Sequence, residues 1–238
     1  MPGYTRRQLK EDKFAETAQG AAQWATGHRR LVVWALGLIV VAVLATTGIV
    51  TWRNRQIDQA NEELVTAMRT WNAPLRPAGT PPPAGEDIPS FTSAAERAKA
   101  AEKQFTEIAN KHSLVAPGKI ARYMSGIALM QAGDTAAAEQ QIKKTADSGD
   151  RDLAALAKMT LASIYRNSNR QGDAAKIYKD LADHPTPTVS KATAQLGLAE
   201  MYETTDPQQA TAIYQQLQKD DPQSMAARVA AQKLTRQK

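Results

Sequence analysis

The sequence predicts an all-α protein in which one N-terminal transmembrane helix is followed by an α-solenoid of paired helices. Three observations support this fold class. Alanine, the residue with the highest helix propensity, fills 43 of the 238 positions, whereas aromatic residues make up only 5% and are too few for a typical β-sandwich core. One stretch near the N-terminus contains twenty consecutive uncharged residues. Beyond it, a pattern of small and large apolar residues recurs about every 36 positions.

The uncharged stretch, residues 31–50, has the length and composition of a membrane span. A helix of this length covers about 30 Å, the thickness of the hydrocarbon core of a bilayer. Arginines flank it on both sides, and Trp34 and Trp52 lie near its ends, where amphipathic rings settle among headgroups. A buried core helix is one alternative, but such helices seldom carry twenty uncharged residues. A cleaved signal peptide is another, with Val43-Leu44-Ala45 as its cleavage site, but the apolar run continues to Val50 and favours an uncleaved anchor.

Residues 1–30 are predicted to form a cytoplasmic tail. Lys and Arg within twenty residues of the span number three on each side, so the local charge balance does not determine the orientation. The short tail carries six basic residues in total, whereas long domains translocate largely regardless of their charge. We therefore expect a single-pass protein with its N-terminus in the cytoplasm and its large C-terminal domain outside.

Two further segments precede the repeats. Residues 51–73 form a predicted membrane-proximal helix, because apolar residues recur there at steps of three and four, and this helix can continue directly from the span. Residues 74–91 are predicted to be a proline-rich loop, since residues 72–90 hold six of the twelve prolines of the chain. Three consecutive prolines at 81–83 favour an extended polyproline conformation, in which a spacer is a commoner role than a ligand for a partner.

Residues 92–238 are predicted to form a helical repeat domain. Four columns of residues recur at spacings of 36 or 37 positions: Ala138, Ala174 and Ala210; Ile142, Tyr178 and Tyr214; Leu129, Tyr165 and Tyr202; and Gly126, Ala162 and Ala199. The small residues let two helices approach closely, and the larger ones fill the space between them. Gly133-Asp134 and Gly172-Asp173 mark the expected turns of the first two units. A single pair of helices cannot bury its apolar face alone, so the units are expected to stack.

These columns resemble the tetratricopeptide repeat. Three segments carry the pattern: Gly126-x2-Leu129 with Ala138-x3-Ile142, Leu161-Ala162-x2-Tyr165 with Ala174-x3-Tyr178, and Leu198-Ala199-x2-Tyr202 with Ala210-x3-Tyr214. The resemblance covers residues 117–222, although the tryptophan that the family favours early in the first helix is absent. It implies that residues 93–112 form a second helix whose partner is the 52–73 helix, and that residues 224–236 form a terminal capping helix.

The whole arrangement resembles the family of ancillary subunits of the bacterial SecYEG translocon, which are single-span tetratricopeptide-repeat proteins. The shared features are a charged tail containing Glu11-Asp12-Lys13-Phe14, one span, a helix leaving the membrane and three divergent repeats, whereas the prolines at 81–83 depart from the family. The resemblance implies a protein of the bacterial inner (plasma) membrane whose periplasmic C-terminal domain works beside translocon subunits with periplasmic chaperones or secreted polypeptides. Two other functions are compatible with the sequence: a repeat scaffold for envelope assembly or cell division, and a soluble periplasmic binding protein released after Ala45.

Composition argues against several other functions. The chain has no cysteine, which excludes disulfides, a thiol nucleophile and cysteine-ligated metals. The net charge of +6 divides equally between residues 1–30 and the region beyond residue 52, without the basic run that nucleic-acid binding requires. His28, His112 and His184 are far apart in the sequence and are expected on the surface rather than in a metal site. No phosphate-binding loop or nucleophile elbow is present, so we expect neither an enzyme nor a cofactor.

A helical solenoid binds its partners through the concave surface that the first helices of its repeats line. The repeat register places nine candidate protein-binding residues on this surface: Ile120, Tyr123, Ile127, Met130, Leu156, Met159, Arg166, Glu200 and Glu203. The membrane-proximal end is thus expected to be apolar, suited to another helix or an unfolded segment, and the distal end charged. The alternative is that these residues pack on the 52–73 helix or on each other.

Overall fold

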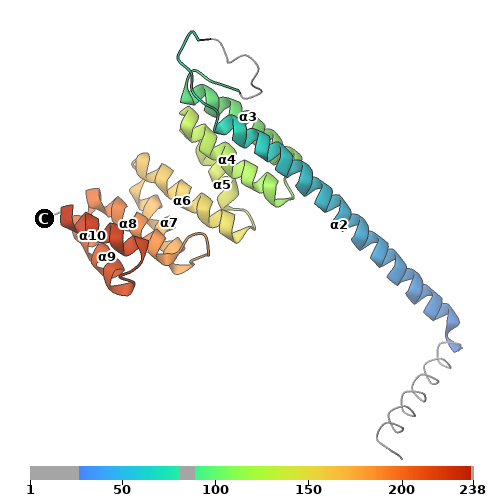
Figure 1. Cartoon of the computed structure of the whole chain (residues 1–238). Helices are drawn as coiled ribbons and strands as arrows, with labels where there is room; N and C mark the ends of the chain where they lie inside the picture. Colours follow the sequence, from blue (N-terminus) through green and yellow to red (C-terminus); the bar gives the residue numbers. More distant parts are fainter. Residues whose placement is uncertain (1–26, 81–88, 237–238) are drawn as a thin grey trace, which may run out of the picture. The chain divides into compact units, whose positions relative to one another are not determined.

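The computed structural model describes residues 27–80 and 89–236. Over these residues the chain is helical, without a β-strand, and only one isolated bridge joins Leu75 and Phe91. The predicted all-α class is therefore confirmed. The helices in chain order are α2 (Arg29–Trp71), α3 (Ala94–Lys111), α4 (Ala116–Ala132), α5 (Thr135–Ala146), α6 (Arg151–Asn167), α7 (Gln171–Asp183), α8 (Lys191–Thr205), α9 (Pro207–Asp220) and α10 (Met225–Arg236) (Figure 1). Most of the predicted tail, up to residue 26, and the three consecutive prolines lie outside the described residues.

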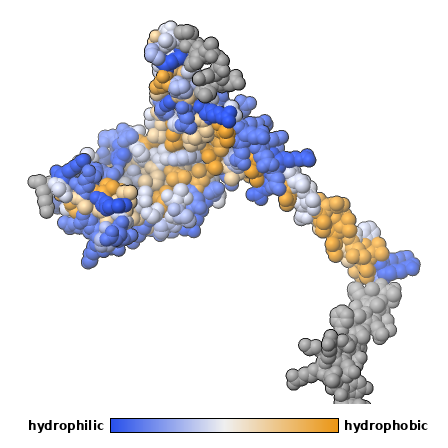
Figure 2. Space-filling view, in the orientation of Figure 1, coloured by the Kyte–Doolittle hydropathy of each residue, from blue (hydrophilic) through white to orange (hydrophobic). Residues whose placement is uncertain are grey.

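The chain divides into two units, Met1–Arg55 and Gln56–Lys238, although α2 contributes to both. In the first unit α2 is continuous over the whole uncharged stretch, where its apolar side chains are exposed, as Figure 2 shows. The hydroxyls of Thr46 and Thr47 donate hydrogen bonds of 2.9 and 2.7 Å to carbonyl oxygens four residues earlier, so their polar atoms are satisfied within the helix. By length and composition, α2 can cross a membrane.

The second unit begins with the C-terminal part of α2, which packs against α3. Ala67 is fully buried in a cluster with Phe105 and Ile108, and the rings of Trp71 and Phe105 lie 6.5 Å apart at a tilted angle. Arg97 of α3 also donates a hydrogen bond of 2.9 Å to the carbonyl of Ala73, just after α2 ends. The pairing of the 93–112 helix with the C-terminal part of α2 is therefore confirmed.

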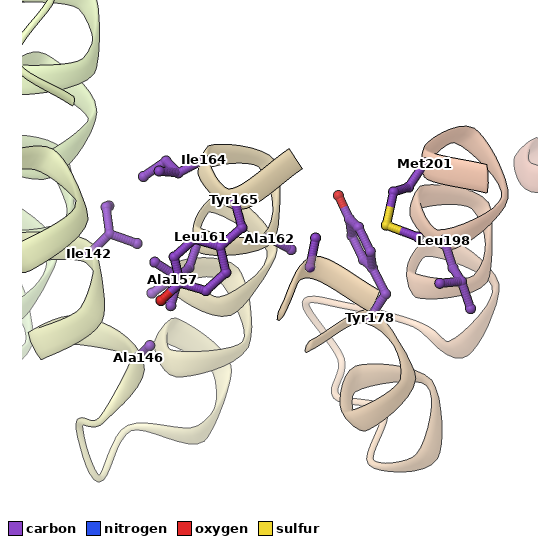
Figure 3. Close-up of a cluster of buried hydrophobic side chains, with 11 residues drawn as sticks. Ile142, Ala146, Ala157, Leu161, Ala162, Ile164, Tyr165, Tyr178, Leu198 and Met201 are labelled. Carbon is purple, nitrogen blue, oxygen red and sulfur yellow. The ribbon is translucent and has the colours of Figure 1, made fainter. Parts of the chain in front are cut away.

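From α3 to α10, each helix packs against the next one in the chain. Three of the four repeat columns predicted from the sequence lie in the core of this stack, whereas Leu129 and Tyr202 of the fourth are only partly buried. Ala138, Ala174 and Ala210 are fully buried, as are Ile142 and Tyr214, with Tyr178 nearly so. Figure 3 shows Ile142 and Tyr178 in one cluster with α6 side chains between them. A Cβ atom at Gly126 would lie only 2.6 Å from Cδ1 of Ile142, so a larger residue would force the Ile142 side chain to shift where α4 meets α5.

Of the two turns predicted at Gly-Asp pairs, the first is confirmed and the second is wrong. Gly133 ends α4 in the left-handed conformation at φ 89°, and Asp134 caps α5 by accepting a hydrogen bond from the backbone N–H of Ala137. Gly172, predicted to lie in the next turn, instead lies in the first turn of α7. The left-handed residue there is Asn169, at φ 58°, because asparagine tolerates this conformation better than most residues with a side chain.

Candidate protein-binding surface

The first helices of the repeats, α4, α6 and α8, are joined by polar contacts between side chains. The hydroxyls of Tyr123 and Thr160 lie 3.0 Å apart and join α4 to α6. Arg166 of α6 forms an ion pair with Glu200 of α8 at 3.7 Å. Glu203 of α8 accepts a hydrogen bond of 3.1 Å from Lys233 of α10. Residues that the repeat register places on one surface are thus linked from helix to helix along the stack, and α10 extends the row.

The apolar candidates are divided between core and surface. Tyr123, Ile127, Met130 and Met159 are partly buried and pack against the central cluster, which contains Leu161. Leu156, together with Met159, packs against a second cluster around Leu181 and Val189. Ile120 is exposed. Most of these side chains therefore contribute to packing while keeping part of their surface accessible, so the two sequence interpretations, core and binding surface, are not mutually exclusive.

One of the charged candidates, Glu203, belongs to a hydrogen-bonded network at the distal end of the stack. One oxygen of Glu203 accepts a hydrogen bond of 2.8 Å from the fully buried Tyr214 hydroxyl, while the other pairs with Lys233. Burial, and after it the hydrogen bond to Glu203, raises the pKa of Tyr214 above its ordinary value. Glu203 therefore has a structural role in joining α8, α9 and α10, and this role reduces the charge that it offers to a partner.

Sequence reasoning missed a groove of about 980 Å³ beside this network, bordered by α8, α9 and α10. Its walls are mostly uncharged polar side chains, including Gln208, Thr211, Gln215 and Gln218. Their spacing along α9 indicates a polar helical face. From the sequence alone, such a face is expected to be exposed to solvent rather than to line a groove. Only the packing of α10 turns it into the side of a groove.

One histidine corrects the expectation that all three lie on the surface. His112 is buried, with Nδ1 2.8 Å from Oε1 of Gln56 and Nε2 3.2 Å from Oε2 of Glu63. Lys111 also pairs with Glu63. Both carboxylate and amide lie on α2, so these contacts fasten the C-terminal end of α3 to α2. The backbone of Gly118 packs closely against the carbonyl group of His112. A Cβ atom at position 118 would lie only 1.9 Å from that carbonyl oxygen.

The other two histidines lie elsewhere and do not form a metal site with His112. His184 is exposed beside Asp180, and His28 lies at the start of the described residues. Over the part of the chain that the structure describes, no group of three His, Cys, Asp or Glu side chains is placed to hold a metal ion.

Paired helices that stack in chain order, with small residues at the contacts and aromatic residues in the core, define an α-solenoid, a class that binds partners through the extended surface of its stack. The chain matches the family model described as a tetratricopeptide repeat-like domain over residues 23–196, and it belongs to that family. No curated protein and no solved structure matches the chain. The matched region starts before the uncharged stretch and ends within α8, so it includes α2 but only part of the third predicted repeat.

Proposed function

We propose that this protein is a membrane-anchored, protein-binding adaptor that serves as an ancillary subunit of the Sec translocon and assists secreted proteins together with periplasmic chaperones. The observation that carries the proposal is that α2 has two parts, an uncharged part of the length of a membrane span and a part that packs in the repeat unit. One continuous helix supplies twenty uncharged residues, nearly all of them exposed, and then, from Gln56 onward, joins the core of the repeat unit. A solenoid built on such a helix is held at the membrane surface, where it can meet polypeptides that leave a translocon.

Two observations support an anchor over a cleaved signal peptide. The family match begins at residue 23 and so covers the apolar helix together with the first repeats. Cleavage after Ala45 would also cut within α2, which has no break between Arg29 and Trp71. We place the N-terminus in the cytoplasm and the repeat unit in the periplasm, on the inner membrane of a bacterium.

The binding role is supported by the family and by the surface of the first helices. Tetratricopeptide repeat-like domains are typically interaction scaffolds rather than catalysts. The surface offers Ile120 as an exposed apolar contact, with Tyr123, Ile127 and Met130 partly accessible beside it. Toward α8 the surface becomes polar, with the Arg166–Glu200 pair. An apolar segment of an incompletely folded chain is the partner that this gradient fits best.

Site-specific photo-crosslinking in cells tests the partnership with the translocon. A photoreactive amino acid replaces Leu36 or Val43, both exposed on α2, or Met225 at the far end of the repeat unit as the control. We expect adducts with translocon subunits from the two α2 positions and none from position 225. Adducts with cell-division or wall-assembly proteins, in the absence of translocon subunits, would overturn the Sec assignment and favour the envelope scaffold.

Two further measurements test the anchor and its orientation. Carbonate extraction should leave the full-length protein in the membrane pellet, whereas a shortened soluble form would show that residues up to about Ala45 are removed. Protease added to spheroplasts should digest the repeat unit, whose helices are joined by exposed turns such as that at Gly133. A fully protected repeat unit would place it in the cytoplasm instead.

A further inference from the structure

The turn between α3 and α4 presents an apolar side chain to solvent. Leu114 is 76% exposed, more than any other large apolar side chain among the described residues, including those of the uncharged stretch. Its neighbours prevent it from turning inward, because His112 is fixed by Gln56 and Glu63, and Val115 is buried as the N-cap of α4. Buried residues on both sides therefore hold Leu114 toward solvent, where its side chain is available for a contact outside the repeat unit.

The segment that contains this turn has an unusual charge pattern. Residues 108–133 contain no Asp or Glu, but they include Lys111, Lys119 and Arg122. The sole acidic partner that the structure gives them is Glu63 of α2, which pairs with Lys111. Ile120, on the first turns of α4, is also exposed. Exposed apolar side chains among basic residues are typical of protein surfaces that contact anionic lipid headgroups.

The chain itself keeps this turn near the membrane. His112 is hydrogen-bonded to Gln56, which follows the last residue of the uncharged stretch, Val50, by six positions. Six residues span at most about 20 Å even when fully extended. Whatever the arrangement of the two units, the α3–α4 turn is therefore tethered within reach of the interface at which the span ends.

We propose that the α3–α4 turn is a second membrane contact, in which Leu114 enters the headgroup region of the bilayer and Lys119 faces anionic lipid. This inference rests on the proposed anchoring by residues 31–50. The contact would fix the tilt of the repeat unit over the membrane, because the unit would then be held at two points rather than by one helix. A fixed tilt keeps the binding surface in one direction relative to the emerging polypeptide.

The absence of cysteine from the chain allows a direct test with single labelled cysteines. Full-length variants Leu114→Cys, Val40→Cys and Met225→Cys, each labelled with an environment-sensitive fluorophore, are reconstituted into vesicles of phosphatidylcholine and phosphatidylglycerol that contain spin-labelled quencher lipids. All three positions are exposed, so the labels leave the core intact. We expect strong quenching at position 40 by quenchers deep in the bilayer, clear quenching at 114 by headgroup quenchers, and none at 225.

The three positions separate failure of this inference from failure of the anchor. If 114 behaves like 225 while 40 is quenched, the anchor stands and the second contact is refuted. If 40 is not quenched, both the anchor and the contact that depends on it are refuted. Replacing phosphatidylglycerol with phosphatidylcholine, or Lys119 with Gln, should weaken quenching at 114. Quenching that is unchanged by both would refute the role of anionic lipid.

Discussion

The two halves of α2 have the same backbone conformation but opposite environments. Residues 31–50 are apolar on every side and exposed, whereas from Gln56 to Trp71 only one face is apolar and its small residues, Ala60 and Ala67, are fully buried. A helix that is apolar all round needs an apolar solvent, while a helix with one apolar stripe needs a protein partner. The first half of α2 thus suits contact with lipid and the second half contact with protein. Substitutions in the two halves should therefore affect membrane anchoring and folding separately.

The largest effect is expected from Ala67→Asp in the second half. Ala67 is fully buried against Phe105 and Ile108, so a carboxylate there would lose its hydration without gaining a partner. We expect a loss of about 3 kcal/mol or more in the free energy of unfolding of the repeat unit. Val65→Asp, two residues earlier and half-exposed, is the matched control and should change stability by less than about 0.5 kcal/mol. Equal urea denaturation midpoints for the two variants would contradict the packing of α2 in the core.

The counterpart in the first half is Val41→Asp. An aspartate at the centre of a spanning helix disfavours insertion by about 2.5–3.5 kcal/mol. Because Val41 is exposed and outside the repeat unit, thermal unfolding of that unit should be unchanged. Carbonate extraction should show a smaller membrane-bound fraction for Val41→Asp and no change for Val41→Leu. Full membrane retention of the aspartate variant would argue against residues 31–50 as the anchor.

The sequence predicted these two halves and the repeat columns because both patterns are local. Charge-free length marks a span, and a spacing of 36 marks stacked helices, as the burial of Ala138, Ala174 and Ala210 confirms. The fold class could therefore be predicted without knowledge of long-range contacts. The groove beside Glu203 could not, because the polar face of α9 lines a groove only where α10 packs beside it.

The burial of His112 also depends on contacts that no local sequence pattern predicts. His112 lies 56 residues from Gln56 and 49 from Glu63 in the sequence, and all three are polar, so no periodic pattern predicts their contact. Their contact follows from the pairing of α2 with α3 across the proline-rich loop. The nearest local signal was Gly118, whose missing side chain leaves room for the carbonyl of His112, but a glycine in the first turn of a helix is also common without such a role.

A smaller effect is expected from His112→Ala. The change leaves a cavity and removes the ring from both Gln56 and Glu63, which should lower the free energy of unfolding by about 2 kcal/mol. His184→Ala removes an exposed histidine of the same chain and should be neutral within about 0.5 kcal/mol. Urea denaturation followed by circular dichroism measures both. If His112→Ala were as neutral as His184→Ala, the contact between α2 and the end of α3 would not contribute to stability.

The smallest effect concerns the pH dependence of the same contact. The hydrogen bond from Lys111, opposed by burial and aided by His112, holds the pKa of Glu63 below its ordinary value of 4.5. A carboxyl whose pKa is lowered by folding stabilises the protein above its unfolded pKa, and this stability is lost as the pH falls through the folded pKa.

Glu63→Gln should therefore be less stable than the wild type at pH 7, by under about 1 kcal/mol because the pair is partly exposed. The difference should shrink as the pH falls from 4.5 through the lowered pKa of the folded state, below which the wild-type carboxyl is neutral. Glu62→Gln, at the adjacent exposed carboxyl, controls for the general loss of one negative charge. A difference for Glu63→Gln that persists unchanged to pH 3 would show that its cause is the shape of the side chain rather than its charge.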